Sequence, residues 1–327
     1  MILELSLPLQ ELTHWLQEQH ILLPEEDVLS IEKPGEGNMN LVIRVKTSQR
    51  SFIVKQAKPF VQKFKSIPAP INRIVSEAAF YKRIEGYSIS ERFPNLIKFI
   101  PSQHILVMED LGVNTDFSFL YQNNNIDKNH LTALVSILWE IHQIPVPKDY
   151  PDNIELRRLN HEHIFVLPFS EHNPIDLEAI QEGLGVLASS VKCNTKLIEK
   201  VRQLGKLYMS LATEDSVLLH GDYYPGSWMK CKEAISILDP EFSFAGNAAF
   251  DLGVMIGHIF IITKDLQLCD ELINQYPSSD IDRNLVKSFA GVEIIRRIIG
   301  VAQLPMKDSI HGKKLLLAQA EEWVLSH

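Results

Sequence analysis

The residues best suited to chemistry are two aspartates that each follow a short apolar run. Residues 217–219 lead into the sequence His-Gly-Asp222, and residues 235–238 lead into Asp239-Pro-Glu. Such runs predict two short β-segments that deliver their carboxylates to the mouth of one cleft. Phosphoryl transfer uses such a pair, because one carboxylate orients the attacking hydroxyl while another holds magnesium on the nucleotide phosphates. We therefore expect Asp222 to act as the base and Asp239 to bind the metal.

Two further oxygen-bearing side chains lie close to these aspartates in the sequence. Glu241 is two positions after Asp239, so on an extended segment it points to the same side, as a second Mg²⁺ ligand or as a partner through water. Ser227 is five positions after Asp222, where such a loop supplies a metal ligand, although a serine hydroxyl is a weak one. One aspartate in a loop is usually a turn former or a cap. Two such loops in this order favour a functional site.

Lys55 and Glu77 form a second pattern, upstream of the aspartates. Lys55 ends the strand-like run Ser-Phe-Ile-Val-Lys, and Glu77 lies on a helix expected at 71–85. In kinases, a helix glutamate fixes the strand lysine that holds the nucleotide phosphates. The alternatives are a solvated lysine at a strand end and a plain surface carboxylate. The order of these residues relative to the two aspartates favours the kinase interpretation.

The segment before this strand is rich in glycine. Gly37, Asn38 and Asn40 lie in the run Gly-Glu-Gly-Asn-Met-Asn, between two strand-like stretches. Glycines let backbone N–H groups approach phosphate oxygens closely, so contact with ATP is one interpretation and an ordinary hairpin loop is the other. The run does not match the Walker pattern, which needs a lysine directly after the last glycine and then a helix.

The predicted secondary structure changes from mainly strands to mainly helices near residue 111. Strand-like runs come first, at 41–45, 51–56, 96–100 and 104–108, with helical patterns at 8–19 and 71–85. Beyond this point the long patterns are helical, at 127–143, 172–189, 195–212, 248–262, 283–300 and 310–325. We therefore expect an α+β fold with a β-rich N-terminal lobe (1–110) and a mainly helical C-terminal lobe (111–327). Backbone groups near Glu109 and Leu111, between these lobes, would bind adenine.

Charged residues interrupt two of the apolar helices. Arg296 and Arg297 are adjacent, and neighbouring helix positions point about 100° apart, so at least one faces inward or into a cleft. A buried arginine needs acceptors, and one structural salt bridge plus one solvated arginine is the alternative to a role in a site. Asp251 begins the apolar helix at 248–262. It is either a simple N-cap or, in a functional interpretation, an anchor that accepts hydrogen bonds from the loop that carries Asp222. We favour the structural role, which here serves the site.

Composition and charge exclude several other functions. The 327-residue chain has a formal net charge of -9, so it has no overall positive potential that would attract nucleic acid or an anionic membrane. We therefore expect neither as a partner. Three dispersed cysteines show no metal-binding spacing and indicate reduced thiols in a cytoplasmic protein. No basic segment precedes an apolar core at the N-terminus, so no signal peptide is expected. The longest apolar stretch, 248–262, is too short to span a membrane.

Six short motifs carry a resemblance to a known family. They are Gly-Asn-Met-Asn (37–40), Val-Lys-Gln-Ala (54–57), His-Gly-Asp-x4-Ser (220–227), Asp-Pro-Glu-Phe (239–242), Phe-Asp (250–251) and Arg-Arg-Ile-Ile-Gly (296–300). In this order they resemble the aminoglycoside phosphotransferase/choline kinase superfamily, and most of all its methylthioribose kinase branch, where serine is typical at position 227. The resemblance implies a bilobal protein-kinase-like fold that uses ATP and Mg²⁺ to phosphorylate a sugar hydroxyl. It also implies that Arg296 and Arg297 contact the substrate or the transferred phosphate.

The loop after Asp222 departs from that branch. It reads Asp-Tyr-Tyr-Pro-Gly-Ser, where methylthioribose kinases typically read Asp-Leu-His-Thr-Gly-Ser, so Tyr224 and Pro225 replace residues beside the acceptor. The favoured hypothesis is a small-molecule kinase for methylthioribose or a related sugar, and the second is a phosphotransferase for an aminoglycoside or choline-like metabolite. The third is a nucleotide-binding pseudokinase, which the presence of Lys55, Asp222 and Asp239 disfavours. The chain is also shorter than those enzymes, which indicates trimmed loops or a smaller dimer surface, and a homodimer is therefore one expected oligomeric state.

Overall fold

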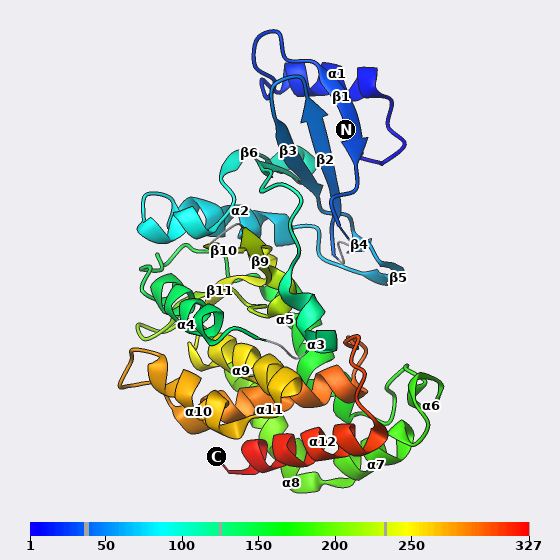
Figure 1. Ribbon diagram of the computed structural model, residues 1–327, viewed down its shortest axis with the longest axis vertical. Helices are drawn as coiled ribbons and strands as arrows, with labels where there is room; N and C mark the ends of the chain where they lie inside the picture. The colour runs from blue at the N-terminus through cyan, green and yellow to red at the C-terminus, as the bar shows by residue number, and fades with distance from the viewer. Residues whose placement is uncertain (36–38, 124–125, 232–233, 327) are drawn as a thin grey trace. The chain divides into compact units, whose positions relative to one another are not determined.

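The computed structural model describes residues 1–326 apart from 36–38, 124–125 and 232–233 (Figure 1). Within these residues the chain forms two compact units, each built from segments that are separate in the sequence. The first unit comprises Met1–Thr115, Pro151–Leu156 and Lys230–Ser243, and the second comprises Asp116–Tyr150, Arg157–Met229 and Phe244–His327. The proposed lobe boundary between residues 110 and 111 stays a prediction.

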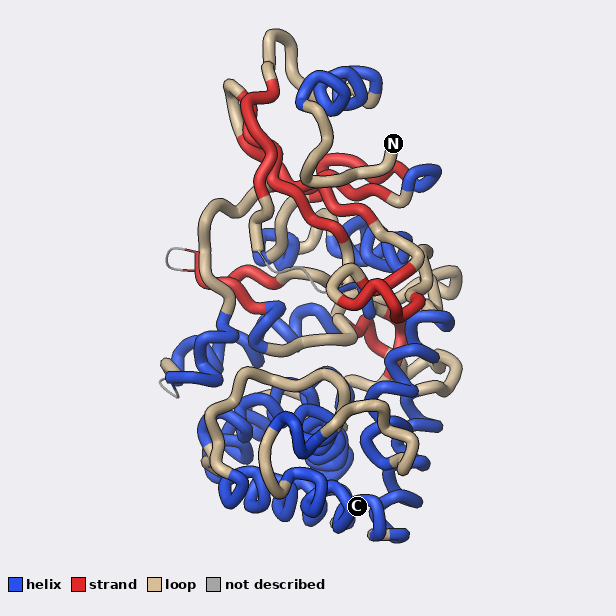
Figure 2. The backbone as a smooth tube through the Cα atoms, turned by 90° about the vertical axis from the view of Figure 1, so that its right-hand side faces the viewer, coloured by secondary structure: helices blue, strands red, loops and turns tan. Residues whose placement is uncertain are grey.

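A five-stranded antiparallel sheet organises the first unit, and its strands are among the red segments of Figure 2. The strand order is β1-β2-β3-β7-β6. Its strands are β1 (Val28–Glu32), β2 (Leu41–Thr47), β3 (Ser51–Gln56), β6 (Leu96–Ile100) and β7 (Ile105–Glu109). Side chains such as Ile43, Phe52 and Val54 form a core with α1 (Leu9–Glu18) on one face of this sheet. Because side chains alternate along a strand, Lys55 points to the opposite face. The expected hairpin and the two later strands are confirmed.

Helix α2 (Arg73–Ile84) lies against that opposite face, where its Glu77 bonds Lys55. The helix stops before Gly86, whose φ of +83° is a left-handed conformation that glycine adopts without strain, as the sequence predicted. The shorter elements of this part of the chain are η1 (Ser88–Arg92), η2 (Pro101–Gln103), β4 (Phe60–Val61), β5 (Phe64–Pro68), β10 (Ala234–Ile237) and η7 (Pro240–Phe242). Strand β9 (Trp228–Cys231) pairs with β10 and carries the chain from the second unit into the first.

The second unit is mainly helical. Its helices, with α5 beginning in the first unit, are α3 (Leu120–Asn123), α4 (Lys128–His142), α5 (Ile154–His161), α6 (Leu177–Ile180), α7 (Leu184–Cys193), α8 (Thr195–Tyr208), α9 (Ala249–Thr263), α10 (Leu266–Gln275), α11 (Arg283–Ile299) and α12 (Ile310–Leu325). Short turns occur at η3 (Phe117–Phe119), η4 (Glu162–Val166), η5 (Leu167–Phe169) and η6 (Pro225–Ser227). Side chains cap the N-termini of most longer helices, as Asp127 does for α4 and Asp282 for α11.

Helix α9 is buried along nearly its whole length and packs against α11, which packs in turn against α12. Glycine permits these close approaches, since a Cβ on Gly257 would lie 2.9 Å from the carbonyl oxygen of Ala290. Beside these helices, β8 (Val217–Leu219) pairs antiparallel with β11 (Phe244–Gly246) and leads into the segment that carries Asp222. The helices expected at 127–143, 195–212, 248–262, 283–300 and 310–325 are confirmed.

The prediction of a single helix at 172–189 is wrong. The chain forms the short α6 and then α7, with Gly183 between them at a φ of +82°. The side chain of Glu178 accepts hydrogen bonds from the backbone N–H groups of Gly183 and Gly185, which stabilises the break. Among the residues that the structure describes, none of the helices combines the length and the apolar character needed to span a membrane.

Candidate functional site

Lys55, on β3, lies between two carboxylates of the first unit. Its Nζ is 2.8 Å from Oε1 of Glu77 and 2.8 Å from Oδ1 of Asp239. The side chains of Lys55 and Glu77 are 3% and 0% exposed, whereas that of Asp239 is 53% exposed. Burial alone would lower the pKa of Lys55, but Asp239, Glu77 and Glu241 together raise it well above its ordinary value. The first unit therefore presents a protonated lysine beside an accessible carboxylate.

The backbone of Asp239 has a φ of +59°, in the left-handed region. A non-glycine residue there is uncommon, and aspartate is among the residues that adopt this conformation most readily. Pro240 follows directly and opens η7, so the chain turns sharply from β10 and brings Glu241 toward α2. Glu241 is buried, and burial raises the pKa of its carboxyl group. The two acidic side chains of this motif thus differ: Asp239 is accessible, and Glu241 is enclosed.

The loop predicted to contact ATP is described only at its end, because Gly37 and Asn38 lie outside the described residues. Asn40 is buried, and its amide bridges two charged side chains. Its Nδ2 donates to Oε2 of Glu241 at 2.8 Å, and its Oδ1 accepts from Nε of Arg73 at 2.9 Å. Asn40 therefore anchors this loop internally, and any contact with ATP would come from the loop backbone.

Glu109 and Leu111 lie at and just beyond the end of β7. Oε2 of Glu109 accepts hydrogen bonds from the backbone and side chain of Asn95, at 3.1 and 2.7 Å. The carbonyl oxygen of Leu111 accepts a hydrogen bond of 2.6 Å from Nδ2 of Asn114. These contacts hold the strand end in place, and the role of both residues in binding adenine stays a prediction.

In the second unit, the structure brings together the three residues predicted to be catalytic. Oδ1 of Asp222 is 3.8 Å from Nη2 of Arg296 and 3.8 Å from Nη2 of Arg297. The Asp222 side chain is 24% exposed, while the two arginine side chains are 7% and 8% exposed. A partly accessible carboxylate is thus flanked by two nearly buried cations. Both arginines face the same carboxylate, so the alternative in which one of them is solvated is wrong.

A buried glutamate that the sequence analysis did not single out holds the arginine pair. Glu293 accepts hydrogen bonds from Nε of Arg296 and, at 2.7 Å, from Nε of Arg297. Nε2 of His258 lies 2.8 Å from Oε1 of Glu293, and Nδ1 of His258 lies 2.6 Å from the hydroxyl of Tyr121. Burial favours a raised pKa for Glu293, but the two guanidiniums and His258 hold that pKa well below its usual range. The network thus fixes the guanidiniums beside Asp222.

One part of this network had a sequence signal, and the rest did not. Glu293 is three and four positions before the two arginines, a spacing that places all three side chains on one helix face. His258 stands out in the sequence only as a polar residue within the apolar stretch 248–262. Tyr121 is 137 positions from His258, so only the tertiary fold shows that they meet.

Asp251 anchors the segment that precedes Asp222, which was the functional alternative for this residue, and within the described residues α9 has no side-chain cap bond at its N-cap, Ala248. Its carboxylate accepts hydrogen bonds from the backbone N–H groups of His220 at 2.6 Å and Gly221 at 2.9 Å. Gly221 has a φ of +85°, a left-handed conformation that suits glycine. Farther along, Oγ of Ser227 donates to the carbonyl oxygen of Asp222 at 2.8 Å. The loop is thus fixed on both sides of Asp222, and the predicted metal-binding role of Ser227 stays a prediction.

Tyr224, which departs from the methylthioribose kinase pattern, packs against the arginine network. The centroid of its ring is 4.9 Å from Cζ of Arg297 and 5.2 Å from the ring centroid of His258. A Cβ on Gly226 would lie 2.5 Å from the outer atoms of the Tyr224 ring. Glycine at 226 is therefore required for the tyrosine to occupy this position, and Tyr224 forms part of the surroundings of Asp222.

Asp222 and Asp239 belong to different units, so the cleft that they were predicted to share stays a prediction. No cluster of three histidine, cysteine, aspartate or glutamate side chains suited to hold a metal occurs in the described part of the chain. Magnesium does not require one, since it is commonly held by one or two carboxylates together with substrate phosphates and water. The carboxylates of Asp239 and Glu241 are the hard oxygen donors that this ion prefers, so the residues fit it.

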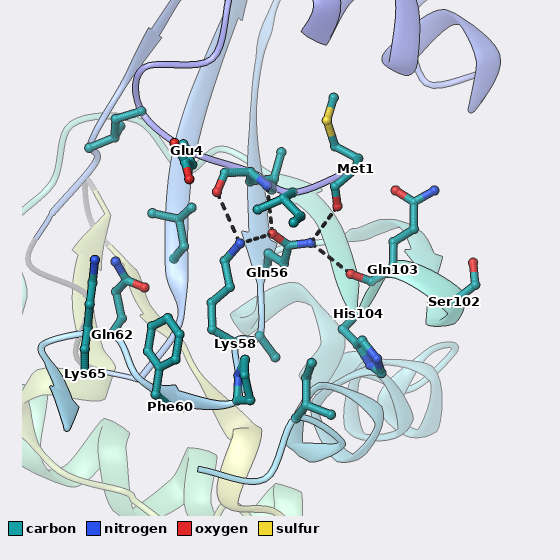
Figure 3. A pocket seen from close by; sticks show the side chains of 17 residues that line it. Met1, Glu4, Gln56, Lys58, Phe60, Gln62, Lys65, Ser102, Gln103 and His104 are labelled. Carbon is teal, nitrogen blue, oxygen red and sulfur yellow. Dashed lines mark hydrogen bonds between the residues drawn. The ribbon is translucent and has the colours of Figure 1, made fainter. Parts of the chain in front are cut away.

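A separate pocket of about 760 Å³ lies in the first unit and contains none of the predicted site residues (Figure 3). The N-terminal residues 1–5 line it together with Gln56 and Lys58. Gln56 donates to the carbonyl oxygens of Met1 and Gln103, and Nζ of Lys58 donates to the carbonyl oxygen of Leu3 and to Gln56. Gln56 follows Lys55 on β3, so it points to the other face of the sheet. These polar groups hold the N-terminal segment against β3.

The sequence and the fold are both similar to those of known proteins. The sequence profile of the phosphotransferase enzyme family matches residues 30–283. Methylthioribose kinase 1 of Oryza sativa subsp. japonica is 25% identical over 251 residues, which cover 72% of this chain and 56% of that protein. Methylthioribose kinase of Geobacillus sp. (strain WCH70) is 25% identical over 353 residues, covering 93% of this chain and 86% of that protein. The chain therefore spans little more than half the length of the first relative and most of the second.

Among solved structures, a spectinomycin phosphotransferase in complex with ADP and spectinomycin is similar, with a TM-score of 0.54 and 14% sequence identity. The match covers 98% of this chain and 98% of that one. At this level of identity the likeness bears on the fold alone. It confirms the α+β, protein-kinase-like fold that was expected.

Proposed function

The chain belongs to the phosphotransferase enzyme family, and we propose that it transfers the γ-phosphoryl group of ATP to a hydroxyl of methylthioribose or a related sugar. One observation carries this proposal. A buried lysine is held between a helix glutamate and an exposed aspartate, with both Nζ–O distances at 2.8 Å. A fixed ammonium beside an accessible carboxylate suits the phosphates of a nucleotide and its metal ion.

On the nucleotide side, Lys55 would hold the phosphates while Glu77 fixes the lysine side chain. Asp239 and Glu241 would hold Mg²⁺, with Ser227 as a further ligand. Magnesium, when bound, neutralises charge on the nucleotide phosphates. The backbone of the loop at Gly37, Asn38 and Asn40 would contact the phosphates, and backbone groups near Glu109 and Leu111 would bind adenine.

On the acceptor side, Asp222 would orient the acceptor hydroxyl and take its proton. As the acceptor oxygen bonds to the γ-phosphorus, the bond from that phosphorus to the bridging oxygen breaks, and ADP leaves with the electron pair. Arg296 and Arg297 would contact the phosphoryl group during transfer. Glu293 keeps both guanidiniums oriented for this task, because it binds the Nε of each and leaves Nη2 directed at Asp222.

A second acceptor class is favoured by one observation. Tyr224 stands where methylthioribose kinases typically have histidine, and its ring packs on Arg297 beside Asp222. The phenol ring of tyrosine is larger than the imidazole it replaces and changes the space available to the acceptor, so an aminoglycoside or a choline-like amino alcohol is the alternative. Cytoplasmic location is part of the proposal, and a homodimer is the oligomeric state to test by light scattering.

An acceptor screen tests the proposal. Consumption of ATP would be measured with methylthioribose, other pentoses, amino alcohols and aminoglycosides, and magnesium would be omitted as the control. We expect magnesium-dependent turnover that is highest with methylthioribose or another sugar. Turnover only with an amino alcohol or aminoglycoside would establish the alternative. Binding of ATP without turnover on any acceptor would instead indicate a pseudokinase.

A further inference from the structure

Arg73 begins α2, is fully buried at 0% exposure, and was not singled out by its sequence context. Its guanidinium donates to Oδ1 of Asn40 at 2.9 Å and to the carbonyl oxygens of Lys58 at 2.9 Å, Pro70 at 2.6 Å, Met39 at 2.9 Å and Phe60 at 3.5 Å. A guanidinium carries five N–H groups in a rigid plane. The whole donor capacity of Arg73 is therefore used inside the first unit.

The charge of Arg73 is balanced by Glu241. Nε of Arg73 lies 3.5 Å from Oε2 of Glu241, and the side chains are 0% and 7% exposed. Asn40 bridges the two, because its amide accepts from Arg73 and donates to Glu241. Burial lowers the pKa of Arg73, and the carboxylates of Glu241 and Glu77 act against that effect. Since a buried ion without its partner is costly, these three side chains depend on one another.

The contacts of Arg73 join three segments that serve the nucleotide side. Met39 and Asn40 end the glycine-rich loop that is predicted to contact the phosphates. Lys58 and Phe60 continue the chain beyond β3, the strand that carries Lys55. Glu241 belongs to the turn that presents Asp239. The guanidinium of Arg73 thus joins the end of the glycine-rich loop, the segment just beyond β3 and the turn that contains Glu241.

We propose that Arg73 is a positioning residue for nucleotide binding, which acts through Asn40 and Glu241 and does not itself touch ATP. The inference rests on the proposed function, because it takes the Lys55 cluster to be the nucleotide site. It adds that the affinity for ATP depends on the planar geometry of a buried guanidinium. It also assigns Glu241 a second task, as the counter-ion that keeps Arg73 in place.

The test uses Arg73→Lys with Arg157→Lys as a matched control. Lysine keeps the charge that Glu241 needs, but it cannot reproduce the planar fork of donors. Arg157 is also a buried arginine, 3% exposed, and it donates to the carbonyl oxygens of Tyr208 and Ser210 in the second unit. Both substitutions remove a guanidinium that binds backbone carbonyls, but only Arg73 contacts residues near the proposed nucleotide site.

We expect Arg73→Lys to weaken ATP binding, measured by isothermal titration calorimetry without any acceptor, by about tenfold or more. In turnover assays KM for ATP should rise by a similar factor, while kcat at saturating ATP changes far less. Arg157→Lys should lower thermal stability and leave the ATP affinity unchanged. Asn40→Ala, which removes the bridge and keeps both charges, should reproduce the raised KM and serves as the second variant if Arg73→Lys does not fold.

Unchanged ATP affinity in folded Arg73→Lys, or in Asn40→Ala if the lysine variant does not fold, would overturn the inference. Equal losses of ATP affinity in the Arg73 and Arg157 variants would also overturn it, because they would indicate a general effect of stability. Failure of the proposed function has a different signature. The unmodified protein would then not bind ATP, or would bind it without phosphorylating any acceptor.

Discussion

Glu293 and His258 share a hydrogen bond of 2.8 Å between α11 and α9, and both side chains are almost completely buried. Glu293 stays ionised because two arginines surround it, so the neutral imidazole donates from Nε2 and accepts the Tyr121 hydroxyl at Nδ1. The orientation of the two arginines beside Asp222 therefore depends on the protonation state of a histidine that is sealed from solvent.

This dependence predicts acid sensitivity. Burial lowers the pKa of His258 from 6.5 to about 4, so between these values the unfolded chain binds a proton that the folded protein does not. The free energy of unfolding should therefore fall as the pH falls through this window, by up to about 3 kcal/mol from His258 alone. Glu293 behaves differently: its contribution is complete above pH 4.5 and is lost only below, as the pH approaches its depressed pKa.

Urea denaturation between pH 7 and pH 5 measures this effect. His258→Gln keeps a donor toward Glu293 and an acceptor for Tyr121, so the variant should lose less stability on acidification than the unmodified protein. His14→Gln, at an exposed position on α1, is the control and should retain the original pH dependence. Identical pH slopes for His258→Gln and the unmodified protein would contradict the prediction.

Asp222→Asn tests the assignment of the base. We expect kcat to fall by on the order of a thousandfold or more, because an amide cannot take the proton of the acceptor hydroxyl. ATP affinity should stay close to its original value, as measured by calorimetry. Asp215→Asn, an exposed aspartate shortly before β8, should leave both quantities unchanged. Near-normal turnover of Asp222→Asn would rule out its role as base.

Lys55→Met separates the stabilising role of the lysine from its proposed role in ATP binding. Glu77 would lose its ion-pair partner while remaining buried, so the free energy of unfolding should fall by about 3 kcal/mol. Adding Glu77→Leu should restore much of that stability without restoring ATP affinity. Lys46→Met is the control, because Lys46 and its partner Glu32 are both exposed and their pair contributes little. Recovery of ATP binding in the double variant would refute the role of Lys55.

Asp251→Asn should loosen the loop that carries Asp222. An asparagine offers one acceptor oxygen, whereas the aspartate accepts from two backbone N–H groups, so we expect a loss of about 2 kcal/mol in stability. The melting temperature and kcat should fall together. Asp127→Asn is the matched control, because asparagine caps a helix as well as aspartate does. Unchanged kcat in Asp251→Asn would show that the loop holds its shape by other contacts.

Local patterns predicted most of the fold, because strands and helices have distinct periodicities and glycine stops are visible in the sequence. They also predicted the contact of Lys55 with Glu77 and included the anchoring role of Asp251 as one of two alternatives. They failed at 172–189, where the left-handed Gly183 and the side chain of Glu178 divide a helical pattern. Contacts set by long-range topology could not be found this way. Arg73 gave no local signal, since its partner Glu241 enters the first unit from far along the chain.

The first unit is built from three separate segments of the chain, so its parts are synthesised at different times. On the ribosome, β2, β3 and α2 emerge long before residues 230–243, which complete that unit. Until then Lys55 lacks Asp239, 184 positions away, and Asn40 lacks Glu241, 201 positions away. Closing such long loops is slow, and two cations that become buried, Lys55 and Arg73, lack Asp239 and Glu241 as counter-ions until then. The nascent N-terminal sheet therefore cannot close around its charged centre until the segment Lys230–Ser243 has been synthesised.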